Sequence, residues 1–390
     1  MFFGHLAPPV KRLSVAAGFC CVAALAAVPQ PPTVKKLENL GFLTGAKAPG
    51  NTLKQGGVGG TDLGYPAYSE KWGKMFLFFG DTFERPENLK GDWRSNVVGY
   101  GDPGRIVRDR ILDGFVTNRP GRACAAVEGR HVDGHEMTRI PTGAIEVDRR
   151  LYLFFFSMRS WKLPRNVRMN GGGAAFSDDA GVTWTEIPAL YRKNLLDGDS
   201  SGDVCGFTQV FPVYGRDGFV YFFGEGGFRS GPIRLARARA ACPDVENPSH
   251  WEYFTGTDDG NHCWKEGTEG LHLCHKLEKA NLVDDLCGEF SVCWNPYLGR
   301  WLMIYTREGE GEGRVTPISI RARVADHPWG PWSESTFLFD RKFPFGYKCN
   351  SVYGGLTHER MMENGGKTVY LLYSQYSPVY QSSVMRLEFQ

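Results

Sequence analysis

The sequence predicts an all-β fold, a five-bladed β-propeller, and its composition and repeats support this. Short segments rich in aromatic residues recur five times along the 390-residue chain, at Met75–Phe79, Leu151–Phe156, Phe219–Phe223, Trp301–Tyr305 and Thr368–Tyr373. Their first residues are 76, 68, 82 and 67 positions apart, a regular spacing that is typical of a repeat architecture. The 49 glycines and the 13% of aromatic residues fit many short strands joined by tight turns, and they disfavour a helical bundle.

The residues before each aromatic segment predict a hairpin turn and a preceding strand. Glu70–Gly73, Gly215–Gly218 and Asn364–Gly366 are typical turn sequences. Further strands follow in several units, so each unit is expected to hold about four strands, as a propeller blade does. A two-sheet sandwich is the alternative, but it would not require five similar units. We expect the propeller to span residues 50–390, after an N-terminal linker at residues 27–49.

One short motif has a recognised place in propeller blades. Residues Ser177–Trp184 match the Asp-box pattern S-x-D-x-G-x-T-W, which forms a hairpin turn on the outer strands of a blade. The motif supports the fold, and its usual role is structural. Asp179 is therefore not expected to be catalytic.

The first 26 residues are expected to be a signal peptide. Lys11 and Arg12 precede an apolar run over residues 13–28, with Ala-Leu-Ala at 24–26 and prolines directly afterwards. The run is shorter than the ~20 residues that a membrane-spanning helix needs, although an uncleaved anchor is the alternative. We expect a secreted, extracellular protein that has no membrane attachment after cleavage.

Charge and cysteine content narrow the possible partners. Without the leader the chain has 43 basic and 43 acidic residues, and no basic tract indicates a nucleic-acid partner. No CxxC pair is present, which argues against a structural zinc site. We expect no metal site, no cofactor and a monomer. An even number of cysteines in an exported chain favours disulfides, with Cys263 and Cys274 the best local candidates. The eight cysteines after the leader are Cys124, Cys205, Cys242, Cys263, Cys274, Cys287, Cys293 and Cys349.

Reflecting the sequence across each predicted hairpin turn identifies residues that should meet at one mouth of the central channel. The first strand of a blade lines the channel and the second returns antiparallel, so the start of one faces the end of the other. This operation pairs Asp62 with Asp81 in the first blade. The other blades add the pairs Gln209–Glu225, Glu289–Arg307, Glu136–Trp161 and Thr138–Arg159, with His358 from the fifth blade.

Paired carboxylates that face a common space are what glycoside hydrolysis requires. One stays ionised while its neighbour is kept protonated, and aromatic and arginine side chains suit a sugar face and its hydroxyls. The competing interpretation is that Asp62 and Asp81, each beside a glycine, cap strand ends. Because the two reflect onto each other, we favour a catalytic pair. The predicted substrate-binding residues are Arg94, Asn96, Arg159, Trp161, Gln209, Glu289, Asn295 and His358.

Seven segments of the chain resemble a known family. They are Gly59–Gly64, Phe78–Phe83, Gly91–Asn96, Ile140–Gly143, Ser157–Trp161, Trp294–Trp301, and Tyr353–Gly355 followed by His358. In order and spacing they are similar to secreted propeller proteins long known as a domain of unknown function, which include bacterial endo-D-arabinanases acting on mycobacterial cell-wall arabinan. The likeness extends from about residue 50 to the C-terminus. It departs from the usual pattern in the eight cysteines and in an insert around Trp251–Leu286.

The resemblance implies a glycoside hydrolase in which two aspartates of the first blade carry out the chemistry, and by motif these are Asp62 and Asp81. The expected substrate is a furanosidic, arabinan-like polysaccharide or oligosaccharide. Inversion is expected on a separate ground: Asp62 begins the channel-lining strand and Asp81 ends a strand that lies farther out, an offset that should widen the gap between the carboxyl groups and admit a water. A non-catalytic glycan-binding propeller or adhesin is the alternative from another class. A sialidase is a weaker alternative, because that fold normally has six blades and an arginine triad.

Overall fold

The computed structural model describes Met1 and residues 27–85, 89–164, 167–194, 206–229, 231–258, 260–309, 317–377 and 379–390. The predicted signal peptide therefore lies, apart from Met1, outside the described residues. The described chain is mostly β-structure, as predicted. No helix in these ranges is long and apolar enough to cross a membrane.

The first predicted unit forms a four-stranded antiparallel sheet. It contains β2 (Gly60–Ser69), β3 (Lys74–Phe83), β4 (Val97–Gly101) and β5 (Gly114–Phe115) in that order. The aromatic segment predicted at Met75–Phe79 lies within β3, and all five of its residues are buried. Helix α1 (Thr52–Gly56) precedes this sheet, and a ribbon of β6 (Thr117–Arg119) and β7 (Arg122–Ala123) follows it.

The second unit forms another antiparallel sheet with the same order of hairpins. Its strands are β8 (Thr138–Val147), β9 (Arg150–Met158), β10 (Met169–Ser177), β11 (Thr185–Glu186) and β12 (Arg192–Lys193). Both β11 and β12 pair with β10, so the outer edge of this sheet is made of two short strands.

The third and fourth units are joined into one nine-stranded sheet, because β15 pairs with β18 at Gly231↔Cys287 and Ile233↔Val283. The strands of the third unit are β13 (Gln209–Tyr214), β14 (Phe219–Glu225), β15 (Gly231–Arg239), β16 (Glu252–Asp258) and β17 (Asn261–Glu266). Those of the fourth are β18 (Val283–Asn295), β19 (Arg300–Glu308), β20 (Pro317–Ala325) and β21 (Thr336–Phe339). Helices α2 (Cys242–Glu246) and α3 (Gly267–Lys276) belong to the same region.

The last sheet is completed by the N-terminal part of the chain. It contains β22 (Val352–Leu356), β23 (Met362–Glu363), β24 (Thr368–Gln375) and β25 (Gln381–Phe389), and β1 (Val34–Phe42) pairs with β25 from Val34↔Phe389 to Phe42↔Ser383. The linker predicted at residues 27–49 is therefore wrong over β1. A strand at this position shields the outer edge of β25, which would otherwise expose unpaired backbone groups.

Short helical turns connect several of these strands. They lie at Arg105–Asp109, Pro188–Leu190, Pro248–His250, Glu278–Ala280, Glu359–Met361 and Asn364–Gly366.

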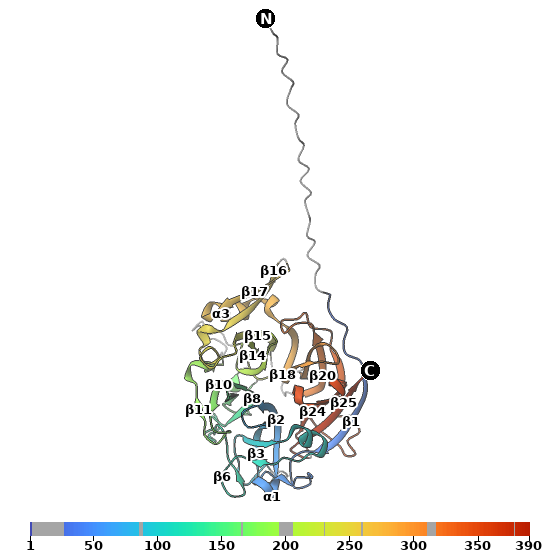
Figure 1. Ribbon diagram of the computed structural model, residues 1–390. Coiled ribbons are helices and arrows are strands. Elements are labelled where there is room, and N and C mark those ends of the chain that lie inside the picture. The colour runs from blue at the N-terminus through green and yellow to red at the C-terminus, as the bar shows by residue number, and fades with distance from the viewer. Residues whose placement is uncertain are drawn as a thin grey trace.

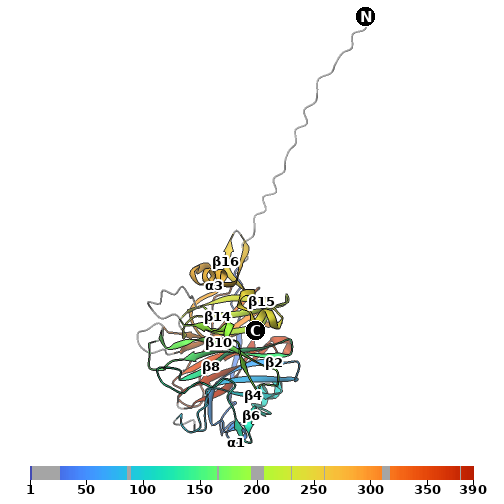
Figure 2. The same cartoon turned by 90° about the vertical axis from the view of Figure 1, so that its left-hand side faces the viewer.

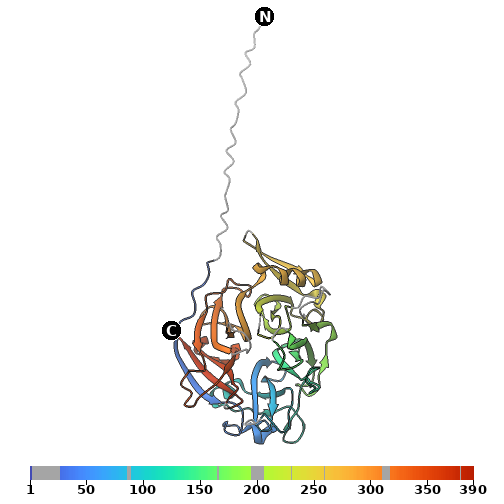
Figure 3. The same ribbon diagram turned by 180° about the vertical axis from the view of Figure 1, so that it is seen from behind.

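The sheets are arranged in a ring, with β2, β8 and β18 near its middle and β11 and β1 at its periphery (Figure 1). The view from behind shows the same ring (Figure 3). The insert with β16, β17 and α3 projects from one edge of the ring, away from β6 and α1, and the side view shows the same arrangement (Figures 1 and 2). The insert therefore lies at the periphery of the ring and not over its middle.

Aromatic side chains from the innermost strands fill the middle of the ring. Tyr65 of β2 contacts Phe211 of β13 with ring centroids 6.2 Å apart, and Phe211 contacts Phe290 of β18 at 6.1 Å. All three are buried. This packing separates the two ends of the channel, so each end presents its own cavity.

The Asp-box has the structural role that the sequence predicted. Oδ1 of Asp179 accepts hydrogen bonds from the Ser177 hydroxyl (2.8 Å) and the Thr183 backbone N–H (2.9 Å), and Oδ2 accepts from the Thr183 hydroxyl (2.7 Å). Trp184 closes the turn by donating to the Gly181 carbonyl, and its ring packs edge-on against Phe78 of the first sheet. The motif thus fixes a turn and connects two neighbouring sheets.

Asp179→Asn is expected to lower the free energy of unfolding by about 1 kcal/mol, because the amide cannot accept the hydrogen bond from the Thr183 hydroxyl. Turnover should be unchanged, since Asp179 is exposed on the outer turn. Urea unfolding monitored by tryptophan fluorescence measures the first quantity. A turnover reduced more than tenfold in folded protein would contradict a purely structural role.

None of the seven cysteines that the structure describes forms a disulfide, and Cys205 lies outside the described residues. The predicted Cys263–Cys274 bridge is therefore wrong. Cys274 is buried in α3, where burial raises the pKa of its thiol to about 12. The Cys263 thiol instead contacts Asp258 within its own hairpin. A loop between two cysteines in the sequence does not establish that their side chains face each other.

Candidate active site

A cavity of about 500 Å³ opens at one end of the channel. It lies where β2 and β22 begin and β3 ends, so residues far apart in the sequence meet there. Its polar lining includes Asp62, Asp81, Arg168, Arg229 and Glu289, and its aromatic lining is Phe83, Trp93, Phe156, Trp161, Phe228, Tyr353, Tyr376 and Tyr380. A few charged groups surrounded by aromatic walls are typical of a ligand-binding site.

Asp62 is placed in the cavity by an irregularity in β2. The ladder between β2 and β3 runs in register from Gly60↔Phe83 to Thr61↔Thr82, and then shifts before Leu63↔Phe79. Such a bulge re-aims a side chain out of the regular alternation. Oδ2 of Asp62 accepts a hydrogen bond from the Tyr353 hydroxyl at 2.7 Å. Oδ1 is buried without a hydrogen-bond partner in the described structure.

Gly80 gives the Asp62 carboxylate its space. A Cβ atom at position 80 would lie 2.2 Å from Asp62 Oδ1, which is far inside van der Waals contact. The carboxylate therefore rests directly on the backbone next to Asp81. Position 80 requires glycine because the Asp62 carboxylate approaches the backbone there too closely to leave room for a side chain.

Asp81 is oriented by two donors on a single oxygen. Its Oδ1 accepts from the Trp93 indole N–H at 2.8 Å and from the Thr138 hydroxyl at 2.5 Å. Its residue surface is 7% exposed, and it lines the cavity. The side chain is consequently fixed between the first and second sheets with one edge facing the cavity.

Burial shifts the protonation of both carboxyl groups in the same direction. It raises the pKa of Asp62 to about 6, although the hydroxyls of Tyr353 and Tyr380 offset part of the rise. Burial raises the pKa of Asp81 to about 7, with the bonds from Thr138 and Trp93 opposing it and the negative charge of Asp62 adding to it. Two nearby carboxyl groups with pKa values close to neutrality are suited to acid and base catalysis.

A buried ion pair forms another wall of the cavity. Arg229 Nε donates to Glu289 Oε1 at 2.8 Å, and Arg229 Nη1 lies 3.5 Å from Glu308 Oε1. The guanidinium also lies over the Tyr353 ring, 4.9 Å from its centroid. Arg229 therefore links Glu289 to the tyrosine that holds Asp62. Oε2 of Glu289 is buried without a hydrogen-bond partner among the described residues.

The structure brings four of the sequence-predicted residues to this cavity: Asp62, Asp81, Trp161 and Glu289. The reflection of Asp62 onto Asp81 differs from the observed ladder only by the bulge, and Gln209↔Glu225 is confirmed as a cross-strand pair. Glu289 also lines the cavity, but the predicted pair Glu289–Arg307 is not observed, because Arg307 pairs with Cys287. Thr138 likewise pairs with Met158 rather than Arg159.

Arg94 and Asn96 do not line the cavity. Arg94 is 1% exposed and donates to the carbonyl oxygens of Gly56, Gly57 and Ala123. Asn96 is equally buried and bonds backbone groups around Val127. Their side chains hold backbone groups of loops outside the cavity lining, so neither is placed to contact a ligand in this cavity.

Arg159 and Gln209 are also outside the cavity lining. Arg159 donates to the Asn170 side chain at 3.0 Å. Gln209 is 3% exposed and donates to the Glu225 carboxylate and to the Gly227 carbonyl. Both positions contradict direct substrate contact at this cavity.

Asn295 and His358 lie toward the opposite end of the channel. Asn295, the last residue of β18, donates to the Gly366 carbonyl. His358 follows β22 and lines a separate cavity of about 380 Å³ together with Tyr68, Glu146 and other residues from the far ends of the inner strands. His358 lies away from the candidate site because β22 crosses the sheet between Tyr353, which lines that site, and position 358.

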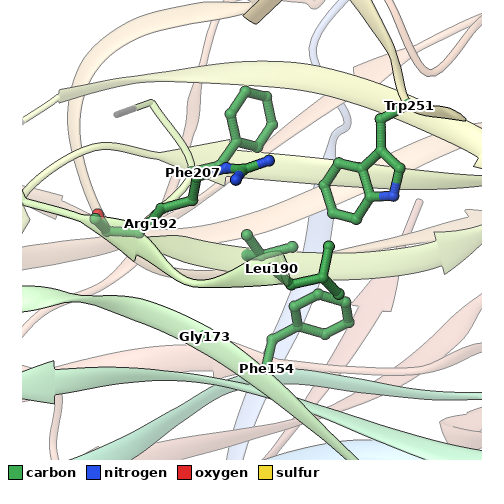
Figure 4. Close-up of a pocket in the computed structure, with 8 residues that line it drawn as sticks. Phe154, Gly173, Leu190, Arg192, Phe207 and Trp251 are labelled. Carbon is green, nitrogen blue, oxygen red and sulfur yellow. The ribbon is translucent and has the colours of Figure 1, made fainter. Parts of the chain in front are cut away.

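A third cavity is too small to hold a sugar. It occupies about 10 Å³ between the second and third units, which is room for one water molecule. Figure 4 shows the rings of Phe154, Phe207 and Trp251 in its lining, with the side chains of Leu190 and Arg192. It is a packing defect of the core and not a candidate site.

The sequence interpretation missed several residues of the candidate site. Trp93 and Tyr353 occur in the segments that carry the family resemblance, and Thr138 was placed near the mouth, but none was assigned a role. The signal was present for Trp93, because a tryptophan beside polar residues in a loop can donate to a buried carboxylate. For Arg229 the local sequence gives no indication of its role, because its partners Glu289 and Glu308 lie on distant strands.

Comparison with solved structures finds proteins that are similar to this chain. A Bacteroides ovatus protein, whose assignment as a hydrolase is itself provisional, is similar with a TM-score of 0.54 at 16% identity, over 86% of this chain and 87% of its own. The Bacillus subtilis arabinanase Arb43A gives a TM-score of 0.45 at 8% identity, over 84% and 95%. The α-L-arabinofuranosidase PaAbf62A from Podospora anserina gives 0.48 at 12%, over 93% and 98%.

No curated protein matches the sequence. The family described as "Domain of unknown function (DUF4185)" matches residues 47–386, which is most of the chain, and this protein therefore belongs to that family.

Proposed function

We propose that this protein is an exported, five-bladed β-propeller glycoside hydrolase that cleaves furanosidic bonds in an arabinan-like glycan, with D-arabinan the first substrate to test. The observation that carries the proposal is the pair of buried carboxyl groups, Asp62 and Asp81, in one aromatic-lined cavity. The volume of that cavity lies within the roughly 300–1,000 Å³ range of ligand sites. The family resemblance of the surrounding segments supports the same substrate class.

The pKa values favour different roles for the two aspartates. Asp81, raised to about 7, is the better general acid, and Asp62, at about 6, is the better base. Asp81 would donate its proton to the glycosidic oxygen as the bond from that oxygen to the anomeric carbon breaks. Asp62 would take a proton from the water that attacks the anomeric carbon. The net reaction adds one water, and exchange with solvent restores both groups.

The remaining cavity residues are suited to holding a sugar chain. Trp161 and Tyr376 are partly exposed at the edge of the cavity, where their rings can stack on sugar faces. Binding energy from these contacts would position the scissile bond between the carboxyl groups.

A bell-shaped dependence of kcat/KM on pH is expected, with its maximum near pH 6.5. Asp62 must be ionised, so activity should fall below its pKa of about 6, and Asp81 must be protonated, so activity should fall above its pKa of about 7. Below pH 6 and above pH 7, kcat/KM should fall by close to tenfold per pH unit. Initial rates from pH 4 to 9 measure the profile, and a flat profile from pH 5 to 8 would exclude this pair as acid and base.

The proposal is tested by release of reducing ends from a panel that includes D-arabinan, L-arabinan, galactan and sialosides. We expect activity on an arabinan and none on sialosides. Asp326→Asn, a change at a surface ion pair with Arg300, serves as a matched variant that should keep wild-type activity. Saturable binding of a glycan without release of reducing ends would instead support a non-catalytic glycan-binding propeller.

A further inference from the structure

Two donors converge on one oxygen of Asp81. The Trp93 indole N–H and the Thr138 hydroxyl both reach Oδ1, at 2.8 and 2.5 Å. An indole N–H can only donate, so Oδ1 must act as an acceptor whenever that bond is present. In a carboxylic acid the oxygen that keeps its double bond to carbon is the stronger acceptor.

The other oxygen of Asp81 is differently placed. Among the described residues no donor contacts Oδ2, and the Asp81 side chain lines the cavity, so Oδ2 is the oxygen left available to that cavity. A proton on Oδ2 therefore points to the space where a glycosidic oxygen would lie. A proton on Oδ1 would face the Trp93 N–H, which is also a donor, and it could not be transferred to a glycosidic oxygen in the cavity.

Trp93 itself is held in place from both sides. Its ring stacks on Phe83 with centroids 5.9 Å apart and an interplanar angle of 15°, and the His131 ring contacts it edge-on at 4.1 Å. His131 has a left-handed backbone (φ 55°), a conformation that costs free energy for a residue other than glycine. Its Nε2 lies 2.8 Å from Glu128 Oε1, which also accepts the Ser95 backbone N–H at 2.9 Å. This chain of contacts fixes the direction of the indole N–H.

We propose that Trp93 is a positioning residue, which together with Thr138 keeps the acid proton of Asp81 on Oδ2, directed into the cavity. This inference rests on the proposed function for the use of that proton, but the position of the proton does not depend on a substrate. The charged and titratable groups around Asp81 are Asp62 from β2, Tyr380 from the segment before β25, and Glu128 and His131 from the segment before β8. None of them contacts Oδ1 in place of Trp93.

The test is the titration of the Asp81 carboxyl, followed by ¹³C NMR in protein with labelled aspartate and assigned by its loss in Asp81→Asn. Trp93→Phe keeps an aromatic ring between Phe83 and His131 but removes the N–H, and Thr138→Val removes the hydroxyl at nearly constant shape. Each bond favours the ionised form, so each variant should raise the pKa of Asp81 by about one unit. Trp184→Phe in the Asp-box, which loses an N–H bond to the Gly181 carbonyl outside the cavity lining, should leave the Asp81 pKa unchanged.

Activity provides a separate measurement. With an active wild-type enzyme, Trp93→Phe should lower kcat about tenfold at its own optimum and move the basic limb of the pH profile upward. An unchanged Asp81 titration in both Trp93→Phe and Thr138→Val would overturn the inference, even in an active enzyme. If the titrations shift but no glycan is cleaved, the positioning of the proton stands and the proposed hydrolase function fails.

Discussion

Asp81→Asn is expected to lower kcat/KM at least about 100-fold, and Asp62→Asn by a comparable factor. The first change removes the proton that the leaving oxygen requires, and the second removes the base that activates water. The side-chain oxygen of the introduced asparagine can still accept from Trp93 and Thr138, so the local geometry should be kept. Initial rates on the best arabinan of the panel, with Asp326→Asn as the control, measure the loss.

The same variants should be at least as stable as the wild type near neutral pH. A carboxyl group whose pKa is raised on folding contributes stability that is present below its unfolded value and is lost as pH rises through its folded value. Folding raises the pKa of Asp81 from 3.8 to about 7. The free energy of unfolding of Asp81→Asn should therefore exceed that of the wild type by up to about 4 kcal/mol at pH 8 and by little at pH 4. Full activity in both folded variants would show that the catalytic carboxyl groups lie elsewhere, with Glu289 the next to examine.

Gly80→Ala is expected to reduce activity by a factor on the order of 100, although position 80 bears no functional group. The added methyl would lie 2.2 Å from Asp62 Oδ1 and must displace that carboxylate from its place beside Asp81. Gly80 does not have a positive φ, so the loss would not come from backbone strain. A crystal structure of the variant measures the displacement, and its initial rates measure the loss.

Gly50→Ala is the matched control for this substitution. Its Cβ would meet neighbouring atoms only at 3.7 Å or more, which is ordinary contact, and activity should remain within about twofold of the wild type. Equal activity of Gly80→Ala and Gly50→Ala would mean that the position of the Asp62 carboxylate does not matter for turnover.

The strands that carry the candidate site could be predicted, because aromatic segments and turn residues specify hairpins locally. The register of the first hairpin follows from its turn, so reflection placed Asp62 near Asp81 although the bulge at position 62 was not visible in the sequence. Where a bulge shifts the register, as between Cys287 and Phe290, the same reflection pairs the wrong residues.

The roles of polar residues beside the motifs could not be predicted in the same way. Arg94 and Asn96 stand close to a glycine and a tryptophan in a loop, but their side chains satisfy buried carbonyl and N–H groups of other loops. Whether a polar side chain faces a cavity or the backbone depends on contacts between distant segments. For the same reason the Arg229–Glu289 pair, which joins β18 to the loop after β14, has no local sequence signal.

The central claim is that Asp62 and Asp81 act as a base and an acid on a glycosidic bond, and the configuration of the first product tests it most directly. A water between the two carboxyl groups requires them to be about 6.5–9.5 Å apart and gives inversion, whereas about 5 Å gives a covalent intermediate and retention. Proton NMR of arabinan digested by the wild-type protein, recorded before mutarotation, should show the inverted anomer first. Product with the anomeric configuration of the substrate would contradict this account and make one of the two aspartates a nucleophile.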